Sequence, residues 1–328
     1  MCGIAGICEF GDGSVHVSCL KSMTAAIAHR GPDDEGYVLF GNGVTLELDG
    51  METDAAGEPF FLGLGHRRLS IIDLSAAGHQ PMPNEDGTIW ITYNGEIYNF
   101  LEIREELRKR GHRFRSNTDS EVILHSYEQW GVDCLRRFNG MWAFALWDGK
   151  KRRLFCARDR FGIKPFYFCR EGDRFLFASE IKAILAYPRV RRIPNDACIY
   201  PYLAYGHLDT TGETFFKGIE QLRGGHYLTV DLESRRIALS RYWDIKPETA
   251  ASGKSDKTYA DEFLELFTDA VRMRLRSDVT VGTCLSGGLD SSSIVCITSR
   301  LLGNNGLRTF SSCFEDERYD ERPFIDEV

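Results

Sequence analysis

Short stretches of alternating apolar and polar residues, separated by glycine turns, dominate the first half of the chain. This alternation predicts β-strands, whereas apolar residues at helical spacing predict three amphipathic helices among them. The predicted strands are Gly3–Cys8, Gly36–Phe40, Val44–Leu48, Phe61–His66, Thr88–Tyr93, Met141–Trp147, Leu154–Arg158, Phe166–Cys169 and Phe175–Ala178, and the helices are Val17–Ala28, Asn99–Arg110 and Ser120–Trp130. Many strands with few helices favour packed antiparallel sheets flanked by helices, an α+β domain.

The pattern changes after Ala178. Two short helices are predicted at Ile181–Ala186 and Asp196–Tyr205, and the polar stretch Trp243–Lys257 is typical of a linker. A helix, a strand, a second helix and a second strand follow, at Tyr259–Leu275, Val279–Leu285, Ser291–Leu302 and Thr309–Cys313. Strand–helix–strand order predicts a parallel sheet, so a second domain of the α/β class begins here.

Composition narrows the class of protein. The chain is 43% hydrophobic and 27% charged, as in ordinary globular proteins, and its net charge of −8 argues against a nucleic-acid binder. The sequence contains neither a secretory signal nor an apolar run long enough to span a membrane. The ten cysteines form no CxxC pair, so neither a disulfide framework nor a zinc site is expected and a reducing cytoplasm fits.

Cys2 is the first candidate for chemistry. Its small side chain should allow removal of the initiator Met, which leaves a thiol and a free α-amino group on one residue. A thiol with a pKa of ~8.5 beside an amine with a pKa of ~7.7–8.0 forms a nucleophile and a base without a histidine. The alternative is a buried cysteine that opens an edge strand.

Five motifs, in the same order, resemble class II glutamine amidotransferases. They are Met1–Gly6, His29–Asp33, His66–Asp73, Asn94–Asn99 and Asp119–Glu121. The resemblance implies the N-terminal-nucleophile (Ntn) hydrolase fold, a four-layer αββα sandwich, with Cys2 as the nucleophile of a glutaminase.

Glutamine carries a carboxylate, an ammonium and an amide, and the motifs contain a group suited to each. Arg68 can bind the carboxylate and Asp119 the ammonium, with Glu96 as a second acceptor. Asn94 and Gly95, expected in a turn, can stabilise the oxyanion with the Asn amide and the Gly N–H. The family pattern also places the backbone of Leu69, Ser70, Ile71 and Ile72 along the substrate.

Each of these residues has a structural alternative. Asn94-Gly95 is also a common hairpin turn, Asp119 can cap the following helix, and Arg68 can belong to a surface ion pair.

A second candidate site follows the strand Val279–Leu285. Ser286, Gly287, Gly288, Leu289, Asp290, Ser291 and Ser292 form a small-residue loop ahead of a helix, an arrangement that binds phosphate. The loop resembles that of ATP pyrophosphatases, which implies an adenine-nucleotide alpha-hydrolase-like fold. Leu285 and Ser312 would then line the ATP site, and Asp290 would hold Mg²⁺. The alternative is a turn that only caps the helix.

The combination resembles the glutamine-hydrolysing asparagine synthetase family, a match strengthened by Arg158–Pro165 and Ala178–Ala183. We therefore expect a glutaminase domain at 2–215, a connecting hairpin and linker at 216–256, and the N-terminal part of a synthetase domain at 257–328, which extends further in the family. The resemblance implies that aspartate is activated by ATP with Mg²⁺ as a β-aspartyl-adenylate, that ammonia travels through an internal tunnel, and that the protein is a homodimer without a tightly bound organic cofactor.

Three alternatives to this function remain open from the sequence. The acceptor can be another carboxylic acid of specialised metabolism, the protein can act as a stand-alone glutaminase, or it can bind glutamine without catalysis.

Overall fold

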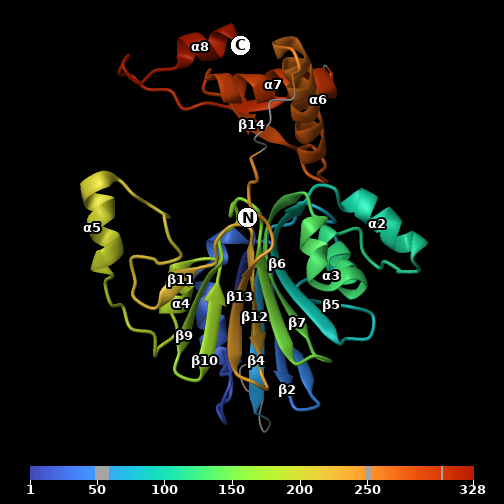
Figure 1. The fold of residues 1–328 in the computed structure, drawn as a ribbon, viewed down its shortest axis with the longest axis vertical. Helices are drawn as coiled ribbons and strands as arrows, with labels where there is room; N and C mark the ends of the chain where they lie inside the picture. The colour runs from blue at the N-terminus through green and yellow to red at the C-terminus, as the bar shows by residue number, and fades with distance from the viewer. Residues whose placement is uncertain (49–58, 248–252, 304–305) are drawn as a thin grey trace. The chain divides into compact units, whose positions relative to one another are not determined.

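The computed structural model describes residues 1–48, 59–247, 253–303 and 306–328, which form two compact units, Met1–Ile245 and Lys246–Val328 (Figure 1). Residues 248–252 of the predicted linker lie outside the described residues. No helix among the described residues has the length and apolar character needed to cross a membrane.

The first unit contains a seven-stranded antiparallel sheet in the order β11-β9-β10-β1-β4-β2-β3. Its strands are β1 (Gly3–Glu9), β2 (Asp34–Gly41), β3 (Thr45–Leu48), β4 (Phe60–Arg68), β9 (Tyr167–Glu171), β10 (Arg174–Ala178) and β11 (Ile219–Gln221). β1 lies in the interior of the sheet, where it pairs with β10 on one side and β4 on the other. The first strand of the chain is therefore held by backbone pairing along both of its edges.

A second antiparallel sheet has six strands in the order β13-β12-β8-β7-β6-β5. Its strands are β5 (Met82–Pro83), β6 (Ile89–Ile97), β7 (Gly140–Asp148), β8 (Arg153–Arg158), β12 (His226–Asp231) and β13 (Arg236–Arg241). Because β12 pairs with β8, the hairpin predicted as part of a connection extends this sheet. The predicted boundary at residue 215 thus lies inside the first unit, which ends at Ile245.

The two sheets pack face to face and helices cover their outer faces, which confirms the predicted αββα sandwich. Ile4 and Cys8 of β1 point into the core between the sheets, whereas Ala5 and Ile7 point toward the outer helices. Burial on both faces explains why β1 reads as a nearly continuous apolar run. The helices are α1 (Val17–Ala25) and α4 (Ile181–Leu185) on the first sheet, α2 (Phe100–Lys109) and α3 (Asp119–Trp130) on the second, and α5 (Asp196–Tyr205). Short 3₁₀ turns occur at Ala28–Arg30, Ala76–Gly78 and Gly131–Arg136.

β6 is longer than predicted, and this corrects one expectation. Asn94 and Gly95 lie within the strand, opposite Ala143 and Trp142 of β7, rather than in a turn after it. The pairing with β7 continues to Ile97. Long-range strand pairing here overrides the local turn preference of Asn-Gly.

The second unit contains α6 (Asp256–Arg274), β14 (Gly282–Cys284), α7 (Leu289–Leu302), β15 (Arg308–Phe310) and α8 (Arg322–Glu327). β14 and β15 pair in parallel, with α7 as the crossover. The predicted strand–helix–strand unit is confirmed, although both strands are shorter than predicted.

Candidate active site

A small cavity in the first unit brings together residues from distant parts of the sequence. Gly3 pairs with Arg67, so the residue before β1 and the end of β4 meet, and β6 lies against both strands. The wall includes nine of the ten predicted glutaminase residues, namely Cys2, Arg68, Leu69, Ile71, Ile72, Asn94, Gly95, Glu96 and Asp119. Ser70 is the exception, because its N–H donates to Asp33 outside the cavity wall.

Cys2 contacts the backbone of the segment after β4. Its Sγ lies 3.4 Å from the N–H nitrogen of Leu69 and 3.6 Å from the Leu69 carbonyl oxygen. Burial raises the pKa of the thiol, whereas burial lowers the pKa of the terminal amine of the neighbouring Met1. Both shifts favour the neutral forms. Removal of Met1 would place the free amine on Cys2 itself, next to its thiol.

The side-chain amide of Asn94 is a buried polar group in the wall of the cavity. It is 1% exposed, and neither its Oδ1 nor its Nδ2 has a hydrogen-bond partner among the residues that the structure describes. Leaving a buried polar group unsatisfied costs about 1–3 kcal/mol, so native proteins rarely do it without a reason. A polar ligand in the cavity would supply the missing partner.

Gly95 is required by the packing of β6 against β7. A Cβ atom there would collide with the carbonyl oxygen of Met141 and lie 2.6 Å from the Cα of Trp142. The hairpin-turn interpretation of Asn94-Gly95 is therefore wrong, and the glycine serves a close strand approach.

Asp119 and Glu96 form the acidic side of the cavity. Asp119 Oδ2 accepts hydrogen bonds from the Tyr93 hydroxyl at 2.7 Å and from the Ile97 N–H at 2.8 Å. Burial raises the pKa of both carboxyls, and the charge of Asp119 adds to the effect on Glu96. The cap of α3 is Thr118, which accepts the N–H of Glu121, so the capping interpretation of Asp119 is wrong.

Arg68 is buried, at 5% exposure, which excludes a surface ion pair. Its Nη1 donates to the Ser75 carbonyl at 3.0 Å, and its Nη2 donates to the carbonyls of Ile72 and Asp73. Three of the five guanidinium N–H groups thus hold the loop after β4. A bidentate contact with a ligand carboxylate would need the other N–H groups or a shift of this loop.

The motif His29–Asp33 explains how this geometry is held. Arg30 Nε donates to the Cys2 carbonyl at 2.9 Å, and its Nη1 binds Glu180 at 2.8 Å. Asp33 accepts the Ser70 N–H at 2.8 Å. One short motif therefore fixes both the residue before β1 and the loop after β4.

Lys164 is a cavity residue that the sequence analysis did not single out. Asp159 accepts its N–H at 3.0 Å, and Arg158 Nε donates to its carbonyl at 2.7 Å. Burial lowers the pKa of its ammonium, while the Glu96 carboxylate opposes that shift. The sequence contained one indication of this role, because Lys164 belongs to the family motif Arg158–Pro165. The contacts of the other residues in that motif serve a tight turn.

The loop of the second unit is short and largely exposed. α7 begins at Leu289, so Asp290, Ser291 and Ser292 lie in its first turn rather than in the loop. The Ser291 hydroxyl lies 3.0 Å from the Ser286 hydroxyl and donates to the Gly288 carbonyl at 3.2 Å. Gly287 has a φ of +78°, which glycine adopts without strain.

Two further contacts describe the surroundings of this loop. Ser292 Oγ is buried, and no described residue forms a hydrogen bond with it. Leu285 is buried, and its carbonyl accepts the Ser311 hydroxyl at 2.6 Å. Ser311 thus contacts the loop, whereas the predicted Ser312 is exposed beside it.

Comparisons with known proteins agree with the division of the chain into two domains. A family described as glutamine amidotransferase domain matches residues 52–243, and one described as asparagine synthase matches residues 262–328. The putative glutamine-hydrolysing asparagine synthetase 2 of Methanocaldococcus jannaschii is 40% identical over 99% of this chain. Asparagine synthetase 3 of Bacillus subtilis is 39% identical over 100% of it. This chain spans only 62% and 52% of the two relatives.

Among solved structures, glutamine phosphoribosylpyrophosphate amidotransferase of Bacillus subtilis matches with a TM-score of 0.54 and 16% identity. The match covers 96% of this chain and 66% of that one. At this identity the likeness shows a shared fold.

Proposed function

The chain belongs to the glutamine amidotransferase family, and from this membership we propose that Cys2 hydrolyses glutamine to glutamate and ammonia. The observation that carries the proposal is the unpartnered, buried amide of Asn94 in the same cavity as the Cys2 thiol. Acyl transfer requires a nucleophile and a hydrogen-bond donor for the oxyanion, and this cavity contains a candidate for each.

In the proposed mechanism, the Cys2 sulfur attacks the side-chain amide carbon of glutamine. The thiol proton passes to the α-amine of the mature Cys2 and then to the leaving nitrogen, which departs as ammonia. Asn94 Nδ2 and the Gly95 N–H stabilise the oxyanion, each donor being worth a few kcal/mol. Water then hydrolyses the glutamyl thioester, which releases glutamate and restores the thiol.

The charged ends of the substrate have matching groups on the wall. We assign the ammonium to Asp119 and Glu96, and the carboxylate to Arg68 with the backbone of Leu69–Ile72. Lys164 adds a positive charge near Glu96 and Cys2. It limits the negative charge that accumulates when the thiol ionises.

For the second unit we propose ATP binding at Leu285–Ser292 and amidation of aspartate. The match to the asparagine synthase family and the names of the relatives support this. ATP would activate the acceptor carboxylate as an acyl-adenylate with release of pyrophosphate, and ammonia would displace AMP. The unpartnered Ser292 hydroxyl in the first turn of α7 fits an oxygen-rich ligand, and Asp290 would hold Mg²⁺.

We also propose the homodimer that the family resemblance implies and the cytoplasmic location that the cysteine usage indicates. All ten cysteines are free thiols, which supports a reducing compartment.

The test is glutamate release from glutamine by the wild type and the Cys2→Ala variant, once mass spectrometry has established removal of Met1. We expect the variant to lose at least ~10³-fold in rate, the scale seen when a nucleophile is removed. Cys198→Ala, a half-buried thiol outside the cavity, serves as the matched control and should keep full activity. Equal rates in the wild type and Cys2→Ala would refute the mechanism.

AMP release tests the ATP-dependent amidation proposed for the second unit. The assay supplies ATP, ammonia and one carboxylic acid at a time, with aspartate compared against glutamate and other acids. We expect AMP release when the acid is aspartate and no AMP release with the other acids.

A further inference from the structure

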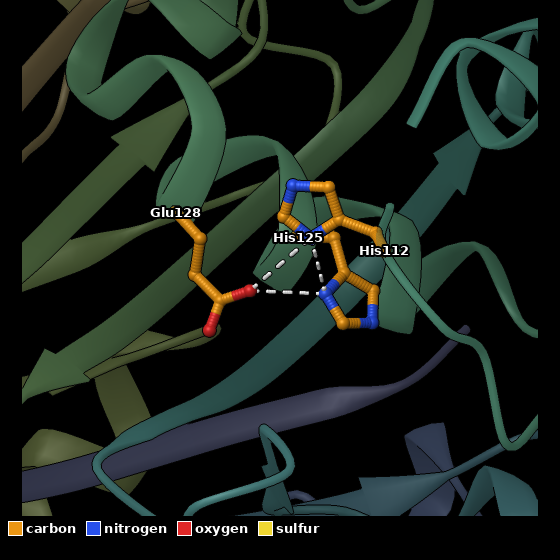
Figure 2. A group of neighbouring side chains, drawn as sticks. All are labelled: His112, His125 and Glu128. Carbon is orange, nitrogen blue, oxygen red and sulfur yellow. Dashed lines mark hydrogen bonds and ion pairs between the residues drawn. The ribbon is translucent and has the colours of Figure 1, made fainter. Parts of the chain in front are cut away.

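His112, His125 and Glu128 form a compact group of side chains (Figure 2). His112 lies in the connection between α2 and α3, whereas His125 and Glu128 lie one turn apart on α3. The two Nδ1 atoms are 3.2 Å apart, and Glu128 Oε2 lies 3.0 Å from His125 Nδ1 and 3.7 Å from His112 Nδ1. None of the three residues lines the cavity around Cys2.

The surroundings determine which ring nitrogens carry protons. His112 Nε2 lies 3.2 Å from Gln129 Oε1, so its proton belongs on Nε2 and its lone pair on Nδ1. His125 Nε2 is buried and lacks a hydrogen-bond partner within the described part of the chain, but the carboxylate oxygens of Glu121 and Glu85 lie 3.7 and 3.8 Å away. They favour a proton on that nitrogen as well.

With protons on both Nε2 atoms, two imidazole lone pairs and one carboxylate oxygen point at a common centre. Such an arrangement is repulsive unless a cation lies between the three atoms, and that cation is either a proton or a metal ion. The observed separations suit a metal, since Zn–N and Zn–O bonds of ~2.0–2.2 Å place tetrahedral ligands about 3.3–3.5 Å apart.

We propose that His112, His125 and Glu128 bind a divalent transition-metal ion, with Zn²⁺ as the preferred ion. Two imidazoles and one carboxylate form a donor set that Zn²⁺ favours, and water would complete the coordination. Contacts around the site hold two of the ligands in place. Gln129 orients the His112 ring, and Asn84 Nδ2 donates to the other oxygen of Glu128 at 2.7 Å.

The position of the site indicates a structural role. α3 carries Asp119 at its first residue, inside the cavity, and the metal ligands on its later turns. Bridging to His112 would tie the α2–α3 connection to this helix. The metal would therefore stabilise the element that supplies Asp119 without taking part in the chemistry.

A proton competes with the metal for the same centre. Burial alone would lower the pKa of His125, but Glu121, Glu128 and Glu85 together raise it to about 9. Half-buried His112 is the other titratable group that faces it. Metal binding would displace the proton that otherwise lies between the His125 ring and its neighbours.

The test measures Zn²⁺ binding to the full chain, freed of metal by a chelator and kept reduced, by equilibrium dialysis at pH 8. Three variants are compared with the wild type. His112→Gln and Glu128→Gln each remove a ligand, and Glu128→Gln keeps an oxygen for Asn84. His16→Gln replaces an exposed histidine as the control. Circular dichroism checks that each variant is folded.

We expect the wild type and His16→Gln to bind one more equivalent of Zn²⁺ than either ligand variant, or to bind it at least tenfold more tightly. Zinc held by thiols would be common to all four proteins and cancels in the comparison. A Co²⁺ spectrum of the wild type should show d–d bands that the ligand variants lose. Equal stoichiometry and affinity in all four proteins would overturn the proposal and leave His125 as a proton-bound imidazolium.

Discussion

The two candidate sites are built in opposite ways. The cavity around Cys2 joins residues from β4, β6, α3 and loops far apart in sequence, and all of them except Met1 are buried or half-buried. The segment Ser286–Ser292 is continuous in sequence, running from the loop after β14 into the first turn of α7, and most of it is exposed. The comparison separates a site made by tertiary packing from one made by local backbone geometry. A ligand in the first meets preorganised buried groups, whereas the second offers backbone N–H groups and a helix N-terminus.

The apolar side chains of the first unit are also more fully buried than those of the second unit. The first unit buries three apolar clusters, between its sheets and under both helix layers. In the described part of the second unit only four apolar side chains are buried, namely Val271, Leu285, Val295 and Ile297. Large apolar side chains such as Phe263, Leu266 and Phe310 are 64–72% exposed there. Substitutions in the first unit should therefore cost more than matched substitutions in the second.

The largest effect is expected on activity. Asn94→Ala should lower kcat for glutamine hydrolysis by about 10²–10³-fold, because it removes an oxyanion donor. It should cost little stability, since the amide forms no hydrogen bond with any described residue. Ser292→Ala removes a buried, unpartnered hydroxyl in the second unit and should leave glutamine hydrolysis unchanged. Steady-state rates and thermal melts of both variants provide the measurement. Equal rates for the two variants would erase the distinction between the sites.

Glycine substitutions should give the next largest contrast. Gly95→Ala forces a methyl group into the backbone of β7 and should lower the free energy of unfolding by about 3 kcal/mol. Gly288→Ala has its nearest neighbour, Ser286 Oγ, at 3.6 Å and a φ of −71°, so we expect less than ~0.5 kcal/mol. Urea unfolding of the full chain compares the two. A Gly288→Ala variant as unstable as Gly95→Ala would show that the loop is more tightly packed than the structure indicates.

A pH-dependent effect should distinguish the first unit as well. The folded-state pKa of His125 is about 9, above its unfolded value of ~6.5. The protonated His125 therefore adds its full contribution to the free energy of unfolding below pH ~6.5, and this contribution is lost as the pH rises through about 9. In the presence of a chelator, we expect a loss of about 1–3 kcal/mol over this range that His125→Gln does not show.

Urea unfolding between pH 6 and 10 measures this difference, and parallel pH profiles for the two proteins would contradict it. The second unit offers no counterpart, since no histidine follows His226 in the sequence.

The smallest contrast concerns two helix caps. Thr118 is buried and its hydroxyl accepts the Glu121 N–H, whereas exposed Ser255 accepts the Thr258 N–H at the start of α6. We expect Thr118→Ala to cost about 1.5 kcal/mol and Ser255→Ala about 0.5 kcal/mol. Unfolding curves followed by circular dichroism would measure both losses. Similar losses would mean that burial does not strengthen this cap.

Much of this molecule is determined by local pattern. Helix α5 begins and ends at the predicted residues, the parallel βαβ unit follows the predicted order, and alternating stretches predicted most strands of both sheets. These elements depend on side-chain periodicity and on residues close in sequence. The motifs likewise indicated Cys2, Asn94 and Asp119 before their positions were known.

Tertiary structure alone decided where these residues meet. Pairing with β7 drew Asn94 and Gly95 into a strand, although the Asn-Gly pair by itself favours a turn. The turn held by Asp159 brought Lys164 into the cavity, and the path from α2 to α3 brought His112 against His125. A sequence pattern records which face of an element is apolar, but not which distant element covers that face. Convergence of polar groups on one point depends on that second choice, because only packing in three dimensions sets the distances between them.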